Sequence, residues 1–90
     1  MQHTDDFPPL TGTQVVLVRA EASTGIVLLP SGDRRLGSGP RYTVFESIPE
    51  AEQYAAAFLW QHPSAECWLG VSPDNFFRRI TATSDESRNA

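Results

Sequence analysis

The sequence predicts a small α+β domain, in which a mostly antiparallel sheet of four or five strands carries one helix on one face. Short β-branched and aromatic runs recur along the chain between turn-forming residues. A single segment has the 3.6-residue period of an amphipathic helix, with helix signals at both ends. The 90 residues are enough for one small core. The expected order is three strands, the helix and two further strands.

Five segments have the composition of strands. They are Val15–Val18, Ile26–Leu29, Arg41–Glu46, Cys67–Val71 and Phe76–Thr81. The first two are apolar on both faces and are joined by a short polar connection with a glycine, which predicts a hairpin. The last two flank Ser72-Pro73-Asp74-Asn75, which suits a type I turn and predicts a second hairpin.

The helix is expected from Ile48 to Gln61. Ser47 and Glu50 have the spacing of a capping box, and Pro49 suits the first helical turn. At the other end, Pro63 pushes the preceding residue out of the helical conformation. The apolar stripe of this helix is made of Ile48, Ala51, Ala55, Phe58 and Leu59.

Three regions follow from this pattern. Residues 1–13 are acidic and interrupted by prolines, and are predicted to be a flexible N-terminal tail. Residues 14–81 form the single α+β domain, and the polar residues 82–90 form a flexible C-terminal tail. Within the domain, Pro30–Pro40 is rich in glycine and proline and is expected to be a long loop.

Charge and cysteine content restrict the function classes. The formal net charge of −4 disfavours non-specific nucleic-acid binding, which needs a positive surface. Cys67 is the only cysteine, so an intramolecular disulfide is impossible, which fits a reducing compartment. The start of the chain is unlike a signal peptide, and the apolar runs are too short to span a membrane. We therefore expect a cytoplasmic protein without a membrane segment.

The candidates for catalysis and metal binding are weak. Cys67 lies in the middle of a predicted strand beside Trp68, which indicates a buried, unreactive thiol. The spacing of His3, His62 and Cys67 matches no zinc pattern. The two carboxylates at Glu50 and Glu52 are two residues apart on a helix and do not face each other. The sequence therefore predicts no enzyme, no metal and no cofactor.

An anion site is the alternative function that the sequence leaves open. Glycines in the Pro30–Pro40 loop would let backbone N–H groups converge on an anion, although no phosphate-binding motif is complete. The arginines that could contribute lie in or next to this loop and on the last strand. They are Arg34, Arg35, Arg41, Arg78 and Arg79. If they converge, they could bind an anion or, less favourably, a nucleic acid.

The leading hypothesis comes from a surplus of apolar surface. The predicted strands are apolar on both faces, whereas one helix covers only one face, so the second face is an association surface. Alternatively, a tail or the long loop covers that face, or the sheet curls on itself. The interface candidates are Trp60, Tyr54, Trp68 and Phe77. We expect a small non-enzymatic protein-interaction module of the accessory, adaptor, immunity or inhibitory kind. Its partner would be another protein or a second copy, as a homodimer.

The stretch from Phe45 to Gly70 resembles the strand–capped helix–strand pattern of many small bacterial proteins. It covers less than a third of the chain, and its motif is structural. The resemblance therefore implies local architecture and no catalytic residues.

Overall fold

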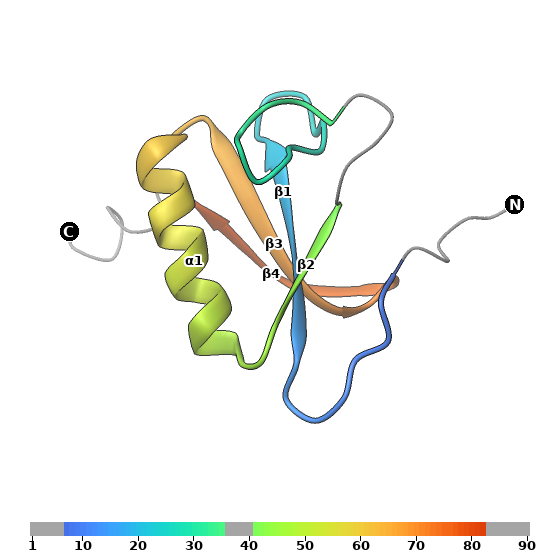
Figure 1. The fold of residues 1–90 in the computed structure, drawn as a ribbon. Helices are drawn as coiled ribbons and strands as arrows, with labels where there is room; N and C mark the ends of the chain where they lie inside the picture. The colour runs from blue at the N-terminus through green and yellow to red at the C-terminus, as the bar shows by residue number, and fades with distance from the viewer. Residues whose placement is uncertain (1–6, 36–40, 83–90) are drawn as a thin grey trace, which may run out of the picture.

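The computed structural model describes residues 7–35 and 41–82, which form one sheet and one helix (Figure 1). The elements are β1 (Val15–Glu21), β2 (Tyr42–Phe45), α1 (Ile48–Gln61), β3 (Ala65–Ser72) and β4 (Asn75–Thr81). The predicted α+β class is confirmed, with four strands. The outer parts of both predicted tails (1–6 and 83–90) and part of the predicted glycine-rich loop (36–40) lie outside the described residues.

The four strands are ordered β2-β1-β3-β4, and each neighbouring pair is antiparallel. Because β2 and β3 are both antiparallel to β1, they run parallel to each other on its two sides. The chain between them contains α1, which crosses one face of the sheet (Figure 1). This crossover places the apolar stripe of the helix over β1 and β3.

The segment Ile26–Leu29 is not a strand of the sheet. The backbone N–H of Glu21 donates to Ile26 O at 2.8 Å, and the N–H of Leu28 donates to Arg19 O at 2.8 Å, so the predicted hairpin begins. It stops there because β2 occupies the same edge of β1 as far as Val18. Only the last residues of β1 remain for this segment, and the contact is reduced to an isolated bridge between Ala20 and Val27.

Local signals account for the bounds of α1, which are those predicted. The Ser47 Oγ accepts a hydrogen bond from the Glu50 backbone N–H at 3.4 Å. The Glu50 carboxylate accepts a hydrogen bond from the backbone N–H of Glu46 at 3.2 Å, one residue before the Ser47 N–H that a capping box would use. His62 ends the helix directly before Pro63.

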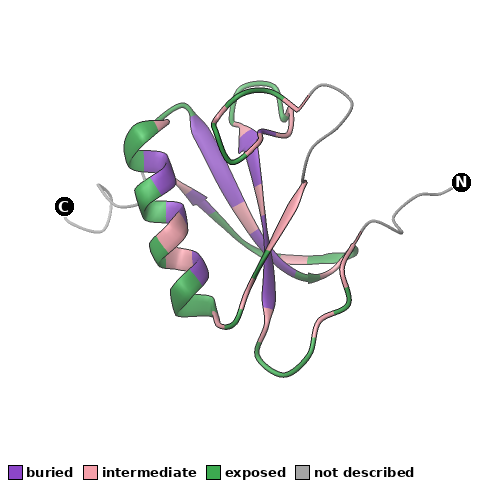
Figure 2. Cartoon of the chain, viewed as in Figure 1, coloured by how far each residue is buried: buried purple, intermediate pink, exposed green. Residues whose placement is uncertain are grey.

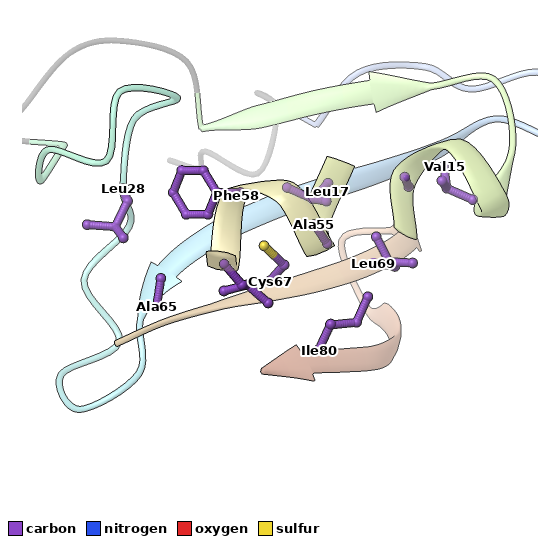
Figure 3. Packing of buried hydrophobic residues seen from close by; sticks show 11 residues of the cluster. Val15, Leu17, Leu28, Ala55, Phe58, Ala65, Cys67, Leu69 and Ile80 are labelled. Atoms are coloured by element: carbon purple, nitrogen blue, oxygen red, sulfur yellow. The ribbon is translucent and has the colours of Figure 1, made fainter. Parts of the chain in front are cut away.

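The main core lies between α1 and the sheet (Figure 2). Figure 3 shows side chains of β1 and β3 meeting those of α1, with Leu17, Cys67 and Leu69 gathered around Ala55 and Phe58. The helix stripe is buried as predicted except at Ile48, which is 39% exposed. Leu28, from the segment after β1, closes the cluster at one end. These contacts hold α1 on one face of the sheet.

Arg19 is an unpredicted member of this region, because its side chain points to the helix side and is fully buried. Its guanidinium donates to Leu28 O at 3.3 Å and to Thr43 Oγ1 at 2.7 Å, and lies 5.9 Å from the centre of the Tyr54 ring. One terminal nitrogen of Arg19 has no hydrogen-bond partner among residues 7–35 and 41–82. Within the described part of the chain, no carboxylate forms an ion pair with it. Neutral oxygens and an aromatic ring therefore stabilise this buried charge.

Candidate binding surface on the open face of the sheet

The face of the sheet opposite α1, here called the open face, carries the alternate side chains of the strands. The registers place Val18 of β1 between Tyr42 of β2 and Trp68 of β3. In the next row, Val16 lies between Val44 and Gly70. Both rows are mainly apolar, as the sequence predicted for a second face without a helix.

Phe7 covers part of the open face. Its ring contacts Tyr42 at 5.1 Å and Phe76 at 6.2 Å between ring centres, both in edge-on arrangements. The chain from this residue to β1 runs on the side of the sheet away from α1 (Figure 1). Nearer to β1, Thr13 donates a hydrogen bond to Glu46 O at 2.7 Å. The described end of the predicted N-terminal tail therefore packs on the domain.

A hollow of about 310 Å³ remains beside this cover. We call it the aromatic hollow, and it is lined by Val18, Val27, Arg41, Tyr42, Trp68 and Phe76. Its lining comes from all four strands or their flanking residues. The hollow is thus a feature of the assembled sheet rather than of one loop.

Trp68 is held in place within this hollow by a short chain of polar contacts. Its indole N–H donates to Glu66 Oε2 at 3.0 Å, and Arg79 donates to Glu66 Oε1 at 2.7 Å. The Arg79 guanidinium also lies 5.9 Å from the centre of the indole ring. Glu66 is buried, so the contact with Arg79 is partly shielded from water. Trp68 is therefore a pre-organised aromatic surface.

Arg41 supplies the second charged group of the hollow. Its guanidinium carbon lies 6.0 Å from the centre of the Tyr42 ring. Among the described residues, its buried Nε has no hydrogen-bond partner and its guanidinium has no carboxylate partner. Because Arg41 lines the hollow, a ligand carboxylate there would be favourable.

Two irregularities in the β3–β4 pairing decide which phenylalanine faces the hollow. The register shifts on both sides of Gly70, which pairs with Phe76. At these two shifts Phe77 of β4 and Val71 of β3 are the extra residues, which pair with no residue of the facing strand. They are 46% and 42% exposed. A Cβ atom on Gly70 would lie 2.5 Å from Cδ1 of Phe76, so glycine permits the ring to lie against the strand. Without these shifts, Phe77 would have paired with Gly70.

The predicted interface residues are not brought together. Trp60 is 86% exposed and lies on α1, on the other side of the sheet from Trp68. Tyr54 is half-buried, and its ring packs against Phe45 and Phe58 with centres 5.2 and 6.0 Å apart. Trp68 alone among the four predicted residues lines the aromatic hollow.

The predicted arginines do not share one surface. Arg78 forms an ion pair with Glu52 of α1 at 3.1 Å, whereas Arg79 pairs with Glu66 on the open face. Arg34 pairs with Glu21 at 3.1 Å, beside the end of β1. Arg35 donates its backbone N–H to Val27 O at 2.8 Å, and only Arg41 of the five lines the hollow. Three of them therefore already have carboxylate partners.

A second hollow of about 400 Å³ lies near the start of α1. It is lined by Gly12, Thr13, Gln14, Val15, Ser47, Ile48, Pro49 and Val71. No charged side chain lines it, so it lacks the combination of aromatic and cationic groups that distinguishes the aromatic hollow.

Burial raises the pKa of the Cys67 thiol to about 12, only partly offset by the nearby Arg19 charge. The thiol is therefore neutral at physiological pH, and a neutral thiol is a poor nucleophile. Among the described residues, no three His, Cys, Asp or Glu side chains gather closely enough to hold a metal ion. In that same part of the chain, no helix is long and apolar enough to cross a bilayer.

No family model, curated protein or solved structure matches this chain. The open face is accordingly the feature of the molecule that bears on function. Of the residues that line or adjoin the aromatic hollow, the sequence predicted a binding role for Trp68 and Arg41. It did not predict that Phe7, Val27 and Phe76 lie beside them.

Proposed function

We propose that this protein is a small non-enzymatic module that binds another protein through the open face of its sheet. The observation that carries the proposal is the aromatic hollow, where Trp68, Tyr42 and Phe76 surround Val18. Rigid aromatic side chains in a partly dry depression are the groups that dominate binding energy at protein interfaces.

The polar contacts around Trp68 support this role. A side chain that is already fixed loses little conformational entropy when a partner packs on it. Glu66 accepts from the indole N–H at the edge of the ring, Arg79 lies over the ring, and Trp68 still lines the hollow. The proposal places the protein in the cytoplasm, where the lone thiol of Cys67 would stay reduced.

The charges favour a different protein over a second copy as the partner. In a symmetric dimer centred on the hollow, Arg41 would face Arg41 of the other copy across a two-fold axis. Like charges in an interface oppose association. Size-exclusion chromatography with light scattering should therefore give a monomer.

A random-peptide library displayed on phage provides the test. Immobilised wild-type protein should enrich clones that bind at least about tenfold more weakly to Trp68→Ala, because an aromatic anchor commonly contributes this much or more. Trp60→Ala is the matched control, since it removes an equally large but distant indole. Circular dichroism should show that both variants are folded.

Two results would contradict the proposal. The first is a library that yields no enriched clones. The second is a set of clones that bind Trp68→Ala as well as the wild type, because their contact would then lie elsewhere.

A further inference from the structure

We infer that the aromatic hollow recognises an apolar side chain with a carboxylate beside it, as in a peptide segment where Asp or Glu adjoins a large apolar residue. This inference rests on the proposed function and names the chemistry of the partner. The inference depends on Arg41, because a site for an apolar group alone would not need a charged side chain in its wall.

The apolar half of the ligand follows from the walls. Val18 forms the floor, and Tyr42, Trp68 and Phe76 stand around it. The volume of about 310 Å³ is at the lower end of the range for ligand sites, about 300–1,000 Å³. A side chain of a docking segment suits this volume better than a large cofactor.

The carboxylate follows from the donors. The buried Nε of Arg41 has no acceptor in the described part of the chain, although buried donors are nearly always satisfied. The two terminal nitrogens of a guanidinium lie side by side, in the geometry that a carboxylate accepts with both oxygens. A single such group suits a carboxylate, which carries one charge.

The positions of the charges also set the orientation of the ligand. On the Trp68 side, Arg79 and Glu66 neutralise each other. Among the described residues, the positive charge without a carboxylate partner is therefore at the Arg41 and Tyr42 end. We expect the apolar side chain over Trp68 and the carboxylate toward β2.

The phage library tests this inference separately from the proposed function. Clones that depend on Trp68 should carry Asp or Glu within two positions of a large apolar residue. Synthetic peptides of these sequences should bind Arg41→Gln about tenfold more weakly than wild type, as expected for the loss of a hydrogen bond between charged groups. Arg78→Gln is the matched control, because this arginine lies on the helix side and pairs with Glu52.

A change on the peptide leaves the protein intact and guards against misfolding of the arginine variant. Replacing the acidic residue of the peptide by its amide should weaken binding to the wild type by a similar factor. The same replacement should have little further effect on Arg41→Gln, because both changes remove one contact.

The outcomes separate the two ideas. Clones that depend on Trp68 but lack acidic residues, or bind Arg41→Gln unchanged, would overturn the carboxylate inference and leave the proposed function standing. Absence of any clone that depends on Trp68 would overturn both.

Discussion

The two faces of the sheet are built from the same strands but are covered differently. On the helix side, α1 and Leu28 enclose Leu17, Cys67 and Leu69 completely. On the open face, Phe7 lies on Tyr42 and Phe76 but leaves a hollow over Val18. One ring of the segment before β1 thus replaces only part of what a helix supplies, and the described residues leave the hollow uncovered.

The comparison also shows where each face places its charges. The helix side encloses Arg19 among neutral oxygens and an aromatic ring, with no carboxylate paired to it in the described residues. On the open face, Arg79 has a carboxylate partner and Arg41 has a buried donor left over. The helix therefore covers Arg19 on its side of the sheet, whereas the open face has at its rim an arginine without a carboxylate partner among the described residues.

The largest expected effect comes from truncating neighbouring residues of β1 that point to opposite faces. Leu17→Ala should lower the free energy of unfolding by about 3 kcal/mol, because it leaves a cavity beneath α1. Val18→Ala should cost only about 1 kcal/mol, because its side chain already borders a hollow. Urea denaturation measures both. Equal losses would show that the two faces contribute alike to stability.

An intermediate effect is expected at the close approach on the open face. Gly70→Ala should destabilise the protein by about 2 kcal/mol, because the new methyl group would collide with the Phe76 ring. In a Phe76→Ala background the same change should cost much less, since the colliding ring is gone. A double-mutant cycle in urea provides the measurement. Additive losses from the two substitutions would contradict this account of Gly70.

The smallest expected effect concerns pH and the helix side. Burial raises the pKa of Cys67 to about 12, so the folded protein keeps the thiol protonated at a pH where the unfolded chain ionises. The resulting stabilisation is fully present below the ordinary thiol pKa and is lost as the pH rises toward 12. Between pH 8 and pH 10 the loss should be about 1–2 kcal/mol, because the unfolded chain ionises first.

The matched control is Cys67→Val. Whatever its absolute stability, this variant should not show the loss of unfolding free energy between pH 8 and pH 10 that comes from the thiol. Thermal unfolding followed across the pH range tests the difference. A wild-type profile parallel to that of the valine variant would mean that the thiol is not held in its neutral form.

Local and periodic signals predicted much of this architecture. The start of α1 could be predicted because Ser47 and Glu50 act within one turn, and its end because Pro63 acts on the residue before it. Alternation in the strands correctly separated Leu69, which is buried, from Trp68, which faces the hollow.

Features that depend on tertiary choices could not be predicted. Composition marks Ile26–Leu29 as a strand, but β2 occupies the edge of β1 that it would need. The shifts around Gly70 exchange the roles of Phe76 and Phe77, and residue types alone do not reveal a bulge. Phe7 follows no strand or helix period, so nothing local indicated where it would pack.

The central position of β1 has a consequence for the order in which the chain folds. Val16 and Leu17 acquire their neighbours Gly70 and Leu69 only after β2, α1 and β3 have been made. The β3–β4 hairpin, by contrast, closes over the short Pro73–Asp74 turn and can form as soon as its two strands are made. A ribosome releases the apolar first strand long before β3, so a nascent chain would expose one edge of β1 until β3 provides a surface for it.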